Sequence, residues 1–364
     1  MTKDCFKLYV HCITFNHARY IKDTMDGFCM QQTNFPYVCI IVDDASTDGE
    51  QDVIRSYLEQ HFVLNDEKNV RRVETEDYVM TFVQHRNNLN CFFAVYLLKY
   101  NHYSVHKSKI KYITEFLESV DYCALCEGDD YWTDPHKLQI QFDYMESHSE
   151  CTMTCHRAQL FSENKKKIVG EQYCRTSDGI LNPVDIINRT GLYIPTCSIV
   201  YRTEIKNYYP EYCNNCNVGD YPLQISAAMK GTVYYFDRIM SVYRIENSFS
   251  WEGRQKFNSI DSDRLHIVKS QMEMFKGFSN DYPKYSRTFR DKISEHIIKN
   301  IPFGYKSDDI HFYTDVFQRE ISEFSFIRKC VLSIYKYPIR IIRRIIRKLF
   351  FGKYYQLRKF YYFI

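Results

Sequence analysis

The chain lacks any apolar run long enough to cross a membrane. A spanning helix needs roughly 20 consecutive apolar residues, and polar or charged side chains interrupt every stretch of that length among the 364 residues. The opening Met-Thr-Lys-Asp-Cys-Phe-Lys also lacks the apolar segment of a secretory signal. No internal repeat or low-complexity tract is present. We therefore expect a cytoplasmic protein, and its 45% of hydrophobic residues is enough for a large packed core.

After Cys216 the sequence also lacks the second cysteine or histidine pair that a zinc knuckle needs. It has 14 cysteines, and a protein that is not exported keeps them reduced, so we expect them to behave as small apolar residues. Cys213 and Cys216 have knuckle spacing, but no further Cys-x-x-Cys or histidine pair follows them. We expect a plain loop at these two residues.

Acidic residues are missing from the end of the chain. The net charge is +3, yet the eleven charged residues from Phe324 to Ile364 are all basic. Over residues 339–350 the basic side chains fall on one face of a helical wheel and the isoleucines on the other. A basic amphipathic helix of this kind is typical of binding to an anionic membrane surface. The alternative is that its isoleucines pack on the rest of the chain or on a second copy in a homo-oligomer. Nucleic-acid binding is not expected, because no recognition motif accompanies the charge.

Strand and helix patterns alternate over the first third of the chain. Phe6–Phe15 and Tyr37–Val42 read as strands, and helices are predicted over residues 18–31 and 51–61. This alternation predicts an α/β fold with a mainly parallel sheet. Further along, Thr232–Tyr243 has the pattern of a hairpin.

Polar clusters fall at the ends of three predicted strands, of which the third is Tyr122–Cys126. They are Thr14-Phe15-Asn16, Asp43-Asp44 and Glu127-Gly128-Asp129-Asp130-Tyr131-Trp132. Ligands of parallel sheets bind at the carboxyl ends of the strands. Carboxylates at such an edge suit a divalent cation that neutralises a nucleoside diphosphate. The alternative is that these residues only form turns and helix caps.

Asp220 stands just before a predicted helix, Leu223–Lys230. The amino end of a helix stabilises an ionised carboxylate, which is the form that a general base needs. The alternative is that Asp220 only caps this helix.

Taken in order, these motifs and the later Tyr243-Arg244 resemble the signature set of glycosyltransferase family 2. The resemblance covers roughly residues 5–250 and depends on five motifs in the right order. It implies a GT-A fold, which is an α/β nucleotide-binding sheet merged with an acceptor-binding half. It also implies an inverting, metal-dependent transfer of a hexosyl or N-acetylhexosaminyl group from a nucleotide-sugar donor, with UDP as the expected nucleotide.

The resemblance further implies roles on the nucleotide side. Thr14, Phe15 and Asn16 would line the nucleotide pocket. Asp43 and Asp44 would hold the base or the ribose, and the resemblance does not assign either residue to one of the two.

Roles at the reacting bonds are implied in the same way. Asp129 would be the chief ligand of Mg²⁺ or Mn²⁺, assisted by Glu127 or Asp130. Trp132 would touch the donor sugar or the acceptor, and Asp220 would be the catalytic base.

The chain departs from the family pattern at three places. Glu127 takes the first position of the usual Asp-x-Asp (DXD) motif, where it can still bind a metal. Glu246 stands after Tyr243-Arg244, where family members often have a histidine. Lys107 falls where the family often places a basic contact to the diphosphate, but it could equally belong to a solvated helix face.

We therefore expect a GT-A domain over residues 1–250, a helical extension over 251–325 and a basic amphipathic tail over 326–364. The expected acceptor is a glycan or lipid-linked hydroxyl in surface polysaccharide synthesis, met at the inner face of the cell membrane. One alternative is a nucleotidyltransferase that makes sugar nucleotides, but Phe15–Arg19 stands where that class has a glycine-rich basic loop. The other is a non-catalytic nucleotide-sugar-binding protein, which the joint presence of Asp129 and Asp220 disfavours.

Overall fold

The structure is a computed structural model, which describes residues 6–65, 70–109, 112, 120–189, 193–214, 216, 219–246, 262–300, 317–322 and 329. The chain divides into two compact units. The first comprises residues 1–182, 191–208 and 223–255, and the second 183–190, 209–222 and 256–364. The division falls inside α6 (Asp220–Lys230), so that Asp220 belongs to the second unit. The basic tail expected over residues 326–364 lies outside the described residues, apart from Lys329.

The described strands of the first unit form one twelve-stranded sheet with the order β10-β12-β8-β11-β6-β1-β2-β5-β4-β3, while β7 pairs with β12 and β9 with β8. Their bounds are β1 (Leu8–Thr14), β2 (Tyr37–Asp43), β3 (Arg71–Glu74), β4 (Tyr78–Gln84), β5 (Cys91–Leu98), β6 (Tyr122–Leu125), β7 (Tyr131–Trp132), β8 (Cys151–Ser162), β9 (Lys167–Gln172), β10 (Gly179–Ile180), β11 (Val200–Arg202) and β12 (Thr232–Ile245).

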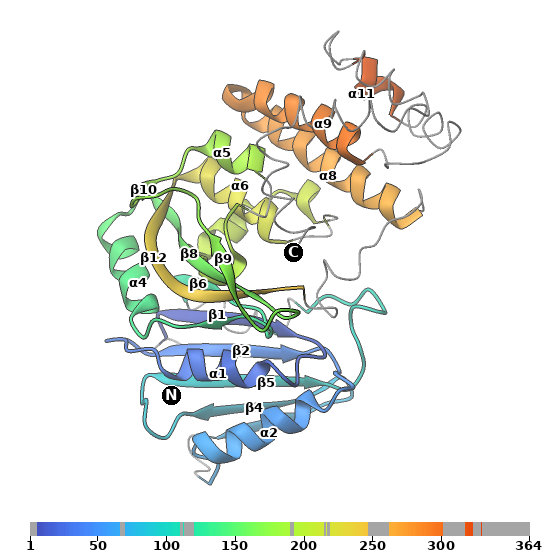
Figure 1. Cartoon of the computed structure of the whole chain (residues 1–364). Helices are drawn as coiled ribbons and strands as arrows, with labels where there is room; N and C mark the ends of the chain where they lie inside the picture. The colour runs from blue at the N-terminus through green and yellow to red at the C-terminus, as the bar shows by residue number, and fades with distance from the viewer. Residues whose placement is uncertain are drawn as a thin grey trace. The chain divides into compact units, whose positions relative to one another are not determined.

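The centre of the sheet is parallel: β1 lies between β6 and β2, and β5 follows β2 (Figure 1). β2 and β5 are buried along their whole length, which explains their continuous apolar sequences. Antiparallel strands such as β4 and β11 join on either side of this centre. The α/β fold with a parallel core that the GT-A resemblance implied is confirmed.

Three helices contribute to the apolar core on one face of the central strands. They are α1 (Ile21–Cys29), α2 (Glu50–His61) and α4 (Lys137–Ser147). Met25, Ile54 and Leu138 from these helices pack into the same cluster as Val10 and Cys39 from the strands. The helices predicted over residues 18–31 and 51–61 are thus confirmed, and they hold the carboxyl ends of β1 and β2 in place.

The hairpin predicted over Thr232–Tyr243 is wrong, because the segment forms a single strand, β12. β12 pairs in parallel with β8, and Figure 1 shows it as a long bent ribbon. Its register shifts between Phe236 and Ile239, so the polar Asp237-Arg238 forms a bulge rather than a turn. This course brings Arg244, near the end of β12, back to the loop that follows β6.

The second unit is helical where it is described, as the sequence predicted. It contains α5 (Pro183–Arg189), the short turn Glu211–Cys213, α8 (Ser262–Asp281), α9 (Ser286–Asn300) and α11 (Gln318–Ser322). Among the described residues, none of the helices combines the length and the apolar character that crossing a bilayer requires.

Candidate functional site

The acidic cluster lies just after β6, where Glu127–Asp130 form a loop that leads into β7 (Tyr131–Trp132). Glu127 is exposed, whereas Asp129 and Asp130 are buried. Asp130 accepts a hydrogen bond of 2.8 Å from the backbone N–H of Arg244. Burial, and then the neighbouring Asp129, raise the pKa of Asp130 well above its usual value. Asp130 therefore fixes the loop, and Asp129 is the buried carboxylate beside it.

Arg244 anchors this loop to the sheet. Its guanidinium donates to the carbonyl of Asp129 at 2.6 Å and pairs with Glu163 at 3.4 Å. The same group lies over the ring of Tyr131, 4.5 Å from its centroid. The sequence placed Arg244 in a motif without indicating its role, because its partners lie more than 80 residues away along the chain.

Helix α1 holds the loop from the other side. The hydroxyl of Thr24 donates to the carbonyl of Gly128 at 3.0 Å and to that of Asp130 at 2.6 Å. Gly128 packs so tightly that a Cβ there would lie 2.0 Å from Oγ1 of Thr14. Only glycine fits between Thr14 and α1.

Trp132 lies in the core beneath the loop, with 2% of its surface exposed. Its indole N–H donates to the carbonyl of Cys197 at 2.9 Å, and Nζ of Lys137 lies 4.1 Å from its ring centroid. Burial lowers the pKa of this lysine to about 7. The structure therefore places Trp132 as a support of the loop.

Asp43 and Asp44 have different environments at the end of β2. Oδ1 of Asp43 accepts hydrogen bonds from the backbone N–H of Ser46 at 3.1 Å and from Nε2 of Gln51 at 2.6 Å. Oδ2 of Asp43 is buried and has no hydrogen-bond partner among the described residues. Burial raises the pKa of Asp43. A buried carboxylate oxygen without a donor is costly, and a ligand N–H would remove that cost.

Both oxygens of Asp44 are already occupied. They accept from the backbone N–H of His102 at 2.7 Å, from that of Tyr103 at 3.2 Å and from Nζ of Lys109 at 2.8 Å. Lys107 instead contacts both oxygens of Asp77 at 2.9 Å. Asp44 thus holds the loop after β5 against the end of β2. Of the two lysines, Lys109 contacts Asp44 and Lys107 contacts Asp77.

The turns after β1 and β2 are interlocked. Asn16 and Ala45 both have φ of 59°, a left-handed conformation that is unfavourable for residues with a Cβ. The amide oxygen of Asn16 accepts from the backbone N–H of Thr47 at 2.8 Å, and its backbone N–H donates to Oγ of Ser46 at 2.8 Å. Phe15, which precedes Asn16 in the turn after β1, is half-buried. These contacts bring the sequence-predicted Thr14-Phe15-Asn16 and Asp43-Asp44 motifs together.

Glu50 is a buried carboxylate that sequence reasoning missed. One of its oxygens accepts from the hydroxyl of Thr14, and the other accepts from the backbone N–H of His17 at 2.8 Å and the hydroxyl of Ser46 at 2.8 Å. Burial raises the pKa of Glu50 to about 7, although the bonds from Thr14 and His17 lower it. In the sequence, Glu50 looks like an ordinary acidic residue in the first turn of a helix.

The donor set at the loop fits a divalent cation in part. Asp129 offers a hard carboxylate oxygen, and Nε2 of His17 lies 3.8 Å from its Oδ2. Within the described part of the chain, no group of three or more Asp, Glu, His or Cys side chains is arranged to hold a metal ion. A cation here would complete its coordination with diphosphate oxygens and water, as Mg²⁺ does with nucleotides.

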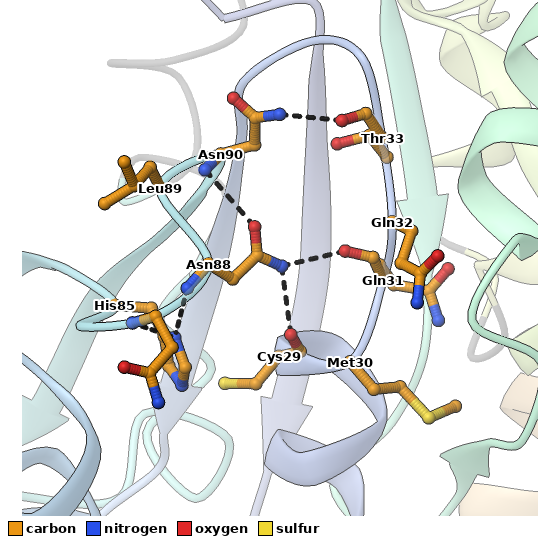
Figure 2. A pocket seen from close by; sticks show the side chains of 10 residues that line it. Cys29, Met30, Gln31, Gln32, Thr33, His85, Asn88, Leu89 and Asn90 are labelled. Atoms are coloured by element: carbon orange, nitrogen blue, oxygen red, sulfur yellow. Dashed lines mark hydrogen bonds between the residues drawn. The ribbon is translucent and has the colours of Figure 1, made fainter.

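Two cavities of similar size lie at opposite ends of the central strands. The first, of about 410 Å³, is lined by Ser46 and Gln51, the two residues that bond Asp43, and by residues at the end of β5. The second, of about 400 Å³, lies where β2 and β5 begin. Figure 2 shows Asn88 there, donating to the carbonyls of Cys29 and Gln31. Because Asn88 binds the backbone, we regard the second cavity as structural.

Asp220 begins α6 in the second unit and is half-buried. Its carboxylate accepts from the backbone N–H of the next residue, Tyr221, at 2.8 Å. The amino end of α6 favours the ionised carboxylate.

Residues 9–76, which contain β1, β2 and the turns described above, match the model of the family Glycosyl transferase family 2. Through this segment the chain is similar to glycosyltransferase family 2. One uncharacterized protein of Mycobacterium bovis and two of Mycobacterium tuberculosis are similar to it, each 29% identical over 249 residues. That alignment covers 67% of this chain and 62% of each relative, so the chain spans less than two thirds of their length.

Two solved structures are also similar to this chain. One is S. aureus TarS 1–349 in complex with UDP-GlcNAc, with a TM-score of 0.48, 14% identity, and coverage of 91% of this chain and 90% of TarS. The other is the mannosyltransferase PcManGT from Pyrobaculum calidifontis in complex with GDP-Man and Mn²⁺, with a TM-score of 0.46, 12% identity, and coverage of 90% and 79%.

Replacing Gly128 by alanine should destabilise the protein. The new Cβ would overlap the side chain of Thr14, and overpacking of this kind costs about 1–3 kcal/mol. Urea unfolding measures the loss. Gly170→Ala is the matched control, because its Cβ would meet only Cδ1 of Leu160 at 3.9 Å. Equal stability of the two variants would contradict the tight packing of the loop.

Proposed function

We propose that this chain transfers a hexosyl or N-acetylhexosaminyl group from a UDP-linked donor to a hydroxyl of a glycan or lipid-linked acceptor, with inversion at the anomeric carbon. The observation that supports it most is the buried Oδ2 of Asp43, which finds no hydrogen-bond partner in the described part of the chain. It lies at the end of a parallel strand, within the segment that matches family 2. The same strand edge carries the anchored loop with the buried Asp129. The base of a nucleotide would need an acceptor such as Oδ2 of Asp43. The charged diphosphate would need a cation held by a carboxylate such as Asp129.

Asp43 suits a uracil ring. The imide N–H of uracil is a donor, and Oδ2 of Asp43 is an acceptor whose partner oxygen is already fixed by Ser46 and Gln51. The neighbouring cavity of about 410 Å³ has room for a nucleoside. The turn Thr14-Phe15-Asn16 borders Ser46 and would contact the ribose and base.

Asp129 suits the diphosphate end of the donor. A Mg²⁺ or Mn²⁺ ion bound there, with Glu127 or Asp130 assisting, would neutralise the charge that develops on the departing diphosphate. The chain's own part is to keep Asp129 in place, through Arg244 and Thr24 on the backbone of its loop. Lys109, or Lys107 if it leaves Asp77, would add positive charge near the phosphates.

Asp220 is the proposed catalytic base. It would take the proton of the acceptor hydroxyl as that oxygen bonds to the anomeric carbon. The bond from this carbon to the phosphate oxygen breaks at the same time, and the diphosphate leaves with the electron pair. The basic tail over residues 326–364 would bring the enzyme to the anionic inner face of the cell membrane, where a lipid-linked acceptor for surface polysaccharide synthesis is found.

Purified full chain should bind one or more UDP-sugars in preference to GDP-mannose in the presence of Mn²⁺. It should also release UDP from that donor slowly, with water as acceptor, and EDTA should stop the release. Calorimetry followed by a UDP-release assay measures both. Binding of no nucleotide sugar would contradict the proposal, whereas nucleotide triphosphate turnover would favour a nucleotidyltransferase.

Asp43→Asn tests the base contact within the same experiment. The Asn oxygen stays with the two donors, Ser46 and Gln51, and its NH₂ then faces the imide N–H of uracil. UDP affinity should fall by about 10- to 100-fold, which corresponds to about 1–3 kcal/mol for an unpaired buried group. CDP affinity should fall less, because N3 of cytosine is an acceptor. Asp52→Asn, an exposed change on α2, is the control.

Asp220→Asn should lower donor hydrolysis or sugar transfer by roughly 10²–10⁴-fold, the range that a general base contributes. UDP affinity should stay unchanged, because the base does not hold the nucleotide. Initial rates and calorimetry on the same preparation measure the two effects. Asp185→Asn, in the first turn of α5, is the matched control. Unchanged turnover in the Asp220 variant would remove it from the base role.

A further inference from the structure

Four side chains form a continuous series between the turn after β1 and the acidic loop. Glu50 accepts from the hydroxyl of Thr14, Oγ1 of Thr14 lies 3.1 Å from Nδ1 of His17, and Nε2 of His17 lies 3.8 Å from Oδ2 of Asp129. All four residues are at least nine-tenths buried. The series therefore links α2 to the buried carboxylate of the donor site.

The directions of these hydrogen bonds follow from the number of protons available. In its ionised form Glu50 only accepts, so the single hydroxyl proton of Thr14 then goes to Glu50. The hydroxyl oxygen of Thr14 in turn accepts from His17, which places a ring proton on Nδ1. When His17 is neutral, which is the form that binds a metal ion, Nε2 then carries the lone pair.

That lone pair faces the carboxylate of Asp129. A lone pair on Nε2 and the carboxylate of Asp129, 3.8 Å apart, repel each other unless a proton or a metal ion lies between them. Ligand atoms about 2.0–2.2 Å from one metal ion can be up to about 4.4 Å apart, so the observed separation suits two ligands of the same ion. A second acceptor that orients a metal-binding histidine through its other nitrogen is a frequent arrangement in metal sites.

We propose that Nε2 of His17 joins Asp129 in binding the divalent cation of the donor complex, with Thr14 and Glu50 as positioning residues that fix the imidazole tautomer. The inference depends on the proposed function for the presence of that cation. It adds a nitrogen ligand that the family resemblance did not assign to this chain. It also explains why Glu50, which contacts no part of the acidic loop in the hydrogen bonds described, is buried at the start of α2.

A nitrogen ligand changes the metal preference of the site. Imidazole favours later transition metals such as Co²⁺ over Mg²⁺, whereas carboxylates alone suit Mg²⁺. The full chain should therefore bind Co²⁺ more tightly than Mn²⁺, and Mn²⁺ more tightly than Mg²⁺. His17→Ala should lower Co²⁺ and Mn²⁺ affinity by about 10- to 100-fold and Mg²⁺ affinity less.

Calorimetric titration of the full chain with each metal, alone and with UDP, measures these affinities without any turnover. Asp129→Asn should abolish binding of all three metals. His148→Ala is the matched control, because this ring stacks on Tyr144 at 4.0 Å and takes no part in the series.

Glu50→Gln tests the positioning role with almost no change in shape. The Gln amide would donate to Thr14, whose proton would then turn to Nδ1 of His17, so the ring would carry its proton on Nε2. Mn²⁺ affinity should fall about as far as in His17→Ala, and ¹⁵N spectra of the His17 ring should show the change of tautomer. Thr14→Ser keeps the hydroxyl and should keep Mn²⁺ affinity, whereas Thr14→Val should lose it. Circular dichroism identifies any variant that fails to fold.

Each outcome decides between the two proposals. His17→Ala or Glu50→Gln with unchanged Mn²⁺ affinity, beside a loss in Asp129→Asn, would overturn the inference and leave the proposed function intact. Donor turnover without any bound metal would overturn the inference and also the metal dependence of the proposed transfer. Mn²⁺ binding that depends on His17 in a chain that binds no nucleotide would uphold the inference and defeat the proposed function.

Discussion

The burial of several carboxylates at one edge of a parallel sheet is the constraint on which the donor site depends. Asp43, Asp44, Glu50, Asp129 and Asp130 are all less than a tenth exposed. A buried carboxylate is costly unless hydrogen bonds or positive charges replace water around it. The surrounding turns are therefore built around these groups, and their left-handed residues, Asn16 and Ala45, occur where backbone N–H groups must turn toward an acceptor.

Two groups of contacts hold the strand ends and the acidic loop in place. On the nucleotide side, Glu50 and Asp44 accept hydrogen bonds from three separate turns and so fix the ends of β1, β2 and β5 relative to one another. On the diphosphate side, Arg244 and Thr24 hold the backbone of the acidic loop. Asp43, whose Oδ2 has no hydrogen-bond partner among the described residues, and Asp129, which lies beside His17, are the carboxylates that we propose as ligand contacts.

The sequence predicted the local structure around this site well. Apolar runs with capping residues identified β1, β2, α1 and α2, because each of these elements depends on neighbours close in sequence. The order of the motifs also pointed to the strand edge where they meet. The separate environments of Asp43 and Asp44 could not be predicted, because the loop that occupies Asp44 comes from residues 102–109. The role of Arg244 could not be predicted either. β12, which carries it, pairs with the distant strand β8, whereas its local sequence has the pattern of a hairpin.

The structure of the full chain crystallised with Mn²⁺ and UDP tests the central claim most directly. Anomalous scattering locates the metal without any assumption about the protein. The account predicts a Mn²⁺ peak in contact with the carboxylate of Asp129 and a uracil ring whose imide N–H faces Oδ2 of Asp43. A nucleotide bound at the opposite end of the strands, in the cavity beside Asn88, or a metal away from Asp129 would contradict it.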